Sequence, residues 1–91
     1  MSKPIFNCFS FNLVGDVSID EINKLTEFFA LNKFQKIADY FYVSEFKTVV
    51  DLVVIVQDAA RKFPWFKNKI EDLKYLRCTD IENLSSIFKN I

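Results

Sequence analysis

The stretch that decides the fold is Val49–Ala60, which reads VVDLVVIVQDAA. Its β-branched residues favour a strand by propensity alone. Its length, and the polar residues that recur at helical spacing, favour a helix instead. Thr48 with Asp51 adds a weak capping box, a pair that satisfies N–H groups in the first turn of a helix. We therefore predict a helix over residues 48–63 that is apolar on most sides, well buried and ended or bent at Pro64.

The chain before this helix predicts a strand, a helix and a pair of strands. Residues 5–14 alternate apolar and polar side chains, which is typical of a strand. Ser18–Glu21 has the pattern of a capping box and begins a helix with one apolar face. Asn32 is the predicted left-handed stop of that helix. Two short strands, 33–37 and 40–44, then follow with a tight turn between them.

The chain after Pro64 predicts a last strand over residues 72–78 and an amphipathic helix that begins with the capping box Thr79–Glu82. The order is therefore β-α-β-β-α-β-α. A four-stranded antiparallel sheet with two helices on one face fits this order, which is the ferredoxin-like plan of the α+β class. The C-terminal helix is an addition to that plan. Because the chain shows no linker, repeat or low-complexity tract, we predict a single domain over residues 1–91.

The composition excludes several kinds of enzyme. The 91 residues contain no histidine, which removes the Ser-His-Asp triad, the Cys-His pair and the histidine general base. A single glycine, Gly15, is too few for a P-loop or a dinucleotide-binding turn. Two cysteines cannot make a four-ligand zinc site by themselves. Any chemistry must therefore use carboxylates, Lys, Arg, Ser, Thr or Tyr.

Charge and hydropathy limit the partners and the location. The 12 basic and 12 acidic residues cancel, which argues against broad binding of duplex DNA or of an anionic membrane. No apolar run approaches the roughly 18 residues that a membrane span needs. The first residues lack the architecture of a signal peptide. We therefore expect a cytoplasmic protein that makes no use of a membrane and keeps its cysteines reduced.

The segment FPWFK at residues 63–67, followed by IEDLKYLR at 70–77, resembles the virulence-associated protein D (VapD) family. The segment DIENLSSIFK at 80–89 is similar to the helix that follows in that family, and length and element order agree over the whole chain. The family is similar in fold to the small nuclease-like protein of CRISPR adaptation. The resemblance implies a ferredoxin-like fold, a link to toxin–antitoxin loci, a homodimer and endoribonuclease activity on RNA.

The catalytic position that the resemblance implies is altered in this sequence. The family has Phe-Asp-Leu near the end of its first strand, whereas this chain reads Phe11-Asn12-Leu13. A carboxylate attracts Mg²⁺ or takes a proton from a 2′-hydroxyl, and a neutral amide does neither well. The family's Gln-Gly-Ser turn also corresponds here to residues 38–40, without the glycine or the serine hydroxyl.

Three interpretations of Asn12 stay open. The protein is an inactive paralogue that serves as a regulatory or antitoxin-like binding partner, or it is an engineered variant of a toxin, or another carboxylate acts. Asp16 and Asp72 are the candidates for that carboxylate, and the register of the first and last strands decides whether Asp72 lies beside Asn12. We assign Asn12 and Asp72 as the candidate catalytic residues. No cofactor follows from the residues, and Mg²⁺ enters only for an active enzyme.

Half of the positive charge lies within a short part of the chain. If the protein binds RNA, the residues that would contact phosphate are Arg61, Lys62, Lys67, Lys69, Lys74 and Arg77. A solvated face with charges paired to neighbouring carboxylates is the alternative. Eleven phenylalanines in 91 residues exceed what one small core can cover, so we expect a homodimer or a tight toxin or antitoxin partner.

Overall fold

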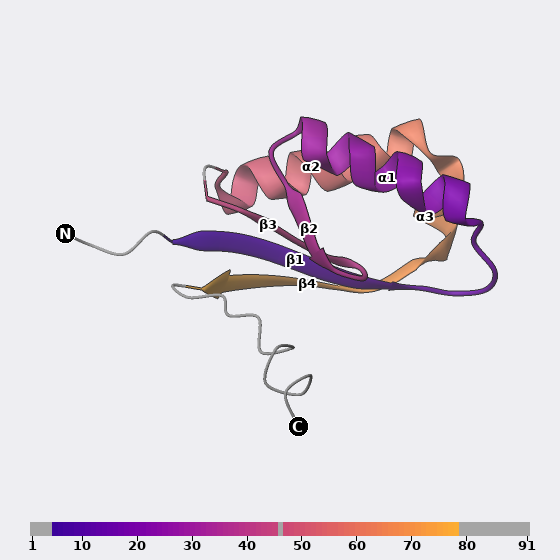
Figure 1. The fold of residues 1–91 in the computed structure, drawn as a ribbon, viewed down its shortest axis with the longest axis horizontal. Coiled ribbons are helices and arrows are strands. Elements are labelled where there is room, and N and C mark those ends of the chain that lie inside the picture. The colour runs from indigo at the N-terminus through magenta and orange to yellow at the C-terminus, as the bar shows by residue number, and fades with distance from the viewer. Residues whose placement is uncertain (1–4, 46, 79–91) are drawn as a thin grey trace, which may run out of the picture.

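The computed structural model describes residues 5–45 and 47–78 of the chain. Its strands and helices follow one another in the predicted order, with one short helix added before the last strand (Figure 1). Their bounds are β1 Phe6–Leu13, α1 Ile19–Leu31, β2 Gln35–Ala38, β3 Phe41–Ser44, α2 Val49–Lys62, α3 Pro64–Lys69 and β4 Ile70–Cys78. The predicted C-terminal helix over residues 79–91 lies outside the described part.

The four strands form one antiparallel sheet in the order β2-β3-β1-β4. β1 lies inside the sheet and pairs with β3 on one side and with β4 on the other. The helices lie on one side of this sheet (Figure 1). The protein is therefore an α+β domain, compatible with the ferredoxin-like plan. The sheet face that the helices do not cover is called the open face below.

The ambiguous stretch that begins at Val49 is a helix, as its spacing predicts. Its capping box is present in both directions: the Asp51 N–H donates to Thr48 Oγ1, and the Thr48 N–H donates to Asp51 Oδ2 at 3.1 Å. The helix buries Leu52, Ile55, Val56 and Ala59 in the core. The prediction that it is well buried is wrong, because its other side exposes four valines by 41% to 68%: Val49, Val50, Val53 and Val54. The helical period thus overrides the strand propensity of single residues because it places the larger buried residues on one face.

The core is built mainly from aromatic rings. Phe9 of β1 lies at its centre and is fully buried. Its ring lies 4.9 Å from Phe29 of α1, 5.2 Å from Phe34 and 5.2 Å from Tyr42 of β3, measured between ring centroids. Phe66 of α3 closes the other end of this cluster against Phe11, at 5.2 Å. The phenylalanines thus join the sheet to all three helices.

Two local predictions are wrong in detail. Asn32 ends α1 with φ −98°, and the left-handed residue is Lys33, with φ 70°. The Asn32 side-chain amide instead donates to the Phe28 carbonyl. This bond gives one carbonyl at the end of the helix a partner while Asn32 keeps a negative φ. The last strand begins at Ile70, two residues earlier than predicted. Pro64 begins a further short helix, α3, which ends at Lys69 directly before this strand.

None of the helices within the described ranges has the length and the apolar character required to cross a membrane.

Candidate functional site

Asn12 projects from the open face near the end of β1. Phe11 and Leu13, its two neighbours, pack against the core, and successive side chains of a strand point to opposite faces. The Asn12 side chain is exposed, as expected for that position. Position 12 is therefore accessible to a large ligand such as a nucleic acid chain.

Asp72 lies directly beside Asn12. The pairing of β1 with β4 brings together two residues that are 60 positions apart, and Asn12 Nδ2 donates to Asp72 Oδ2 at 3.3 Å. Both side chains are exposed. The amide is the donor, so one carboxylate oxygen of Asp72 is held toward β1 and the other oxygen stays available as a proton acceptor. The structure thus brings together the two candidate catalytic residues.

An irregularity in the sheet produces this contact. The register of β1 and β4 shifts between Ser10 and Asn12, and Asp72 has φ 54° at the shift. A non-glycine residue in the left-handed region is uncommon, although aspartate tolerates it better than most side chains. Bulges of this kind redirect a side chain and are frequent next to active sites. Here the bulge accompanies the approach of the Asp72 carboxylate to the Asn12 amide.

A second left-handed residue lies on the other side of β1. Tyr40, in the turn between β2 and β3, has φ 59°, and its carbonyl accepts the N–H of Phe11 at 3.1 Å. The rings of Phe11 and Tyr40 are 5.5 Å apart. A bulky residue in this conformation is a backbone outlier that costs about 1–3 kcal/mol and that its surroundings must compensate. The end of β1 is thus fixed by the β2–β3 turn on one side and by β4 on the other.

Glu71 and Lys74 complete the surroundings of the pair on the open face. Glu71 is the partner of Asn12 in the register, and Lys74 is the partner of Ser10 one step further along. Glu71 was missed in the sequence because the predicted last strand began at residue 72. Its position next to Asp72 was the available signal, but only the register shows that it faces Asn12.

The six candidate RNA-binding residues lie on three elements. Arg61 and Lys62 are at the end of α2, Lys67 and Lys69 on α3, and Lys74 and Arg77 on β4. Of these, only Lys74 lies on the open face near Asn12, since the register places Arg77 opposite Asn7, on the helix side of the sheet.

Three of these basic residues have partners within the domain. Arg61 forms an ion pair with Asp58 at 2.9 Å. The Lys62 ammonium lies over the Phe28 ring, 5.4 Å from its centroid. Lys69 donates to the carbonyl of Asp16, the other carboxylate considered for catalysis. A cation with a partner in the domain contributes less to phosphate binding, because the ligand must compete with that partner.

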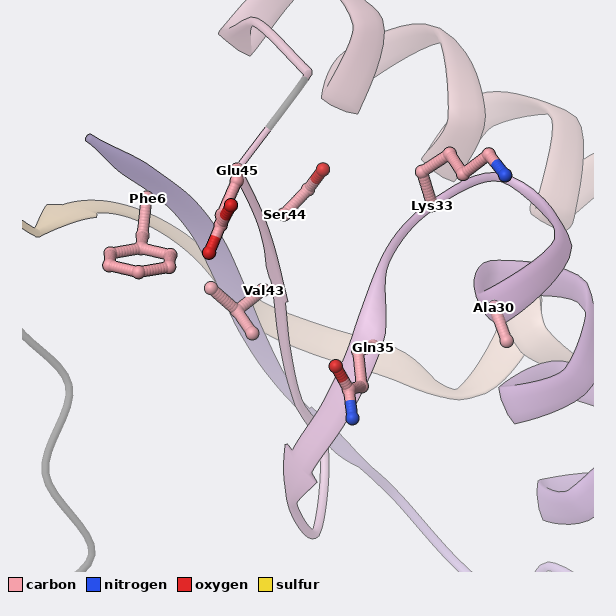
Figure 2. Close-up of a pocket in the computed structure, with 7 residues that line it drawn as sticks. All are labelled: Phe6, Ala30, Lys33, Gln35, Val43, Ser44 and Glu45. Atoms are coloured by element: carbon pink, nitrogen blue, oxygen red, sulfur yellow. The ribbon is translucent and has the colours of Figure 1, made fainter. Parts of the chain in front are cut away.

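A pocket of about 500 Å³ opens at the other end of β1, away from Asn12. Figure 2 shows its lining, with the ring of Phe6 near Val43 of β3 and near Glu45, which follows β3, and with Lys33 on the far side. Its polar side chains come from Lys33, Gln35, Ser44 and Glu45 and include both charge signs. The candidate catalytic pair is thus an exposed surface site, separate from this pocket.

Comparison with family models and with curated proteins finds no match to this chain.

Proposed function

We propose that this chain is a VapD-like protein of a toxin–antitoxin system and that it cleaves RNA at the Asn12–Asp72 pair. One observation supports this above all: the amide at the altered family position donates to a carboxylate on the adjacent strand at 3.3 Å. A carboxylate that is lost from β1 is thus replaced in space by one from β4. The resemblance over residues 61–89 and the ferredoxin-like arrangement support the same assignment.

The proposed reaction uses Asp72 as the general base. Its available oxygen accepts the proton of a ribose 2′-hydroxyl while the Asn12 amide holds the other oxygen. The 2′-oxygen forms a bond to the adjacent phosphorus, the bond from phosphorus to the 5′-oxygen breaks, and that oxygen leaves with a proton from water. Lys74, on the same face, lies where it would attract the phosphate. Asn12 is therefore a positioning residue in this reaction.

Mg²⁺ is not required in this proposal. Residues 5–45 and 47–78 contain no group of three or more Asp, Glu, Cys or His side chains that could hold an ion. Glu71 and Asp72 are nevertheless oxygen ligands of the type that Mg²⁺ binds together with water and phosphate. The cleavage assay is therefore carried out with and without the ion.

A non-catalytic binding protein is the second candidate. The neutral side chain at position 12 favours it, because an amide neither abstracts a proton nor contributes charge to a metal site. In this alternative the fold is retained and the chain acts in the cytoplasm as an antitoxin-like or regulatory partner of another protein. A homodimer fits both candidates.

The test compares four proteins on a labelled single-stranded RNA: the natural chain, Asp72→Asn, Asn12→Asp and the control Asp20→Asn. Asp20 is an exposed carboxylate in the first turn of α1. We expect cleavage by the natural chain, a loss of about 100-fold or more in Asp72→Asn and little change in the control. A natural chain that is inactive, with Asn12→Asp active only with Mg²⁺, would indicate a disabled nuclease. Inactivity of all four would favour the binding protein.

A further inference from the structure

The pocket at the start of β1 lies where the ends of several elements meet (Figure 2). β2 pairs with β3 only as far as Gln35, opposite Val43, so the end of β3 and Glu45 extend past β2. Ala30 of α1 and Lys33, in the turn from α1 to β2, form the other side. The volume of about 500 Å³ falls within the range of about 300–1,000 Å³ that is usual for small-molecule sites. It is called the β1–β3 pocket below.

One part of the β1–β3 pocket is apolar. Val43 is buried, and the half-buried ring of Phe6 lies near it (Figure 2). Within residues 5–45 and 47–78, Phe6 pairs with no other aromatic ring. The pairing of Asn7 with Ser44 holds the start of β1 against the end of β3, so this wall is formed before any ligand arrives. The wall can therefore bury an apolar side chain of a ligand, and such burial is a main source of affinity in small-molecule sites.

Three polar side chains of the pocket have no partner in the described part of the domain. Lys33, Gln35 and Glu45 form neither a hydrogen bond nor an ion pair there through their side chains, whereas Arg61 and Lys36 each pair with a carboxylate. Lys33 and Glu45 lie on opposite sides of the pocket and do not pair with each other (Figure 2). The pocket thus offers one positive group, one negative group and one amide to a ligand.

The backbone holds Lys33 at its place in the pocket. The Lys33 N–H donates to the Ala30 carbonyl at 3.0 Å, and the next residue, Phe34, is fully buried and donates to the Phe29 carbonyl at 2.8 Å. Lys33 has φ 70°, a conformation that costs free energy for a residue with a β-carbon and that glycine usually supplies after a helix. The chain thus keeps a lysine where glycine would be more stable. A role for its ammonium group in ligand binding explains this choice.

We propose that the β1–β3 pocket binds a dipeptide with free ends whose first residue is apolar. Glu45 repels a simple anion that Lys33 attracts, and Lys33 repels a simple cation, so the pocket favours a ligand that carries both charges. The dipeptide carboxylate binds Lys33 and its ammonium group binds Glu45. The first side chain then lies against Phe6 and Val43, which are at the Glu45 end of the pocket (Figure 2). The Gln35 amide is both donor and acceptor, so it matches the peptide C=O and N–H.

The size of the pocket favours a dipeptide over a single amino acid. A sphere of 500 Å³ is about 10 Å across. An amino acid carries its ammonium and carboxylate groups on one carbon atom, so it cannot bring them to opposite walls together. Two extended residues span about 7 Å, which fits within the pocket and places the end groups near both walls. The long side chain of Lys33 adjusts to the carboxylate, because its four-carbon stem is flexible.

The first test titrates the full natural chain, labelled with nitrogen-15, with leucylglycine and follows the backbone amides by NMR. We expect shifts at Lys33, Gln35 and Glu45 and a dissociation constant of about 0.1–1 mM, as for other ligands of about a dozen non-hydrogen atoms. Glycylleucine carries its side chain on the second residue, away from Phe6 and Val43. It should therefore bind about tenfold more weakly.

The second test removes the Lys33 charge without a loss of stability. Glycine favours the φ of 70° at this position, so the urea midpoint of Lys33→Gly should be unchanged or higher, whereas its affinity for leucylglycine should fall about tenfold. Leucylglycine amide lacks the carboxylate and should bind the natural chain about tenfold more weakly. Lys33→Gly should weaken this amide no further, because both changes remove the same bond. The control is Lys24→Ala, which removes an exposed lysine of α1.

Three outcomes would overturn this proposal. No shifts at the pocket with about 10 mM leucylglycine would exclude the site. Free leucine that binds as tightly as leucylglycine would show a site for single amino acids. Equal affinity for leucylglycine and its acetylated amide would show that the two charges play no part. RNA is absent from these assays and the pocket is separate from Asn12 and Asp72, so the proposed function is judged independently.

Discussion

Truncation of Phe29 is expected to remove a large part of the stability of this domain. Phe29 is fully buried, and its ring lies 4.9 Å from Phe9 and 4.8 Å from Tyr42. Replacing a buried Phe by Ala costs about 3–5 kcal/mol, because both apolar burial and packing contacts are lost. A domain of 91 residues has about 5–14 kcal/mol of stability in total. Phe29→Ala should therefore remove between about a fifth and all of that stability.

Urea unfolding followed by circular dichroism measures this loss. With a slope of about 1.5 kcal/mol per M, the midpoint should fall by about 2–3 M. Phe29→Leu keeps part of the side-chain volume, so its urea midpoint should fall by only about 1 M. This variant gives a measurable midpoint if the alanine variant is unfolded. Leu31→Ala, in the same helix but 75% exposed, is the control. A shift below 0.5 kcal/mol in Phe29→Ala would refute the aromatic core described above.

Three further predictions concern single groups. The hydrogen bond from the Thr48 N–H lowers the pKa of the Asp51 carboxyl below 3.8. The Asp51 carboxylate therefore stabilises the folded protein fully above pH 3.8, and this stabilisation is lost as the pH falls through the folded pKa. Asp51→Asn should remove this pH dependence in acid unfolding. Burial raises the pKa of Tyr42 above 10.0, so stability should fall once pH exceeds 10.0, and a Tyr42→Phe variant should lose that decline. Tyr75→Phe breaks the bond to Asn7 and should cost about 0.5–1.5 kcal/mol in urea unfolding, against no loss if that bond is absent in solution.

Local patterns in the sequence predict the elements because they depend on neighbours along the chain. The capping residues Thr48 and Ser18 mark the starts of two helices, and both side chains accept the expected N–H. The helical spacing after Val49 correctly outweighs its strand propensity. The predicted left-handed stop at Asn32 is wrong because the Asn32 side chain ends the helix in another way, by a hydrogen bond to the Phe28 carbonyl.

The sequence alone predicts the residues of the candidate site but not their contact. The residue types Asn12 and Asp72 were visible, and so was the expectation that their strands are neighbours. Whether the two side chains meet depends on the register, and the register includes a bulge at Asp72 that no local pattern announces. Glu71 remained unrecognised for the same reason. A shift of one residue would have turned every one of these side chains to the other face.

The sequence by itself determined the order of the four strands and the two longer helices, the aromatic core and the kinds of site that the composition excludes. These follow from composition and from periods of two and 3.6 residues, which act over a few neighbouring positions. Only the tertiary structure decided that α2 leaves four of its valines exposed, and that Asn12 donates to Asp72. Both depend on contacts between distant parts of the chain, where the packing of helices on the sheet and the pairing of β1 with β4 set the geometry.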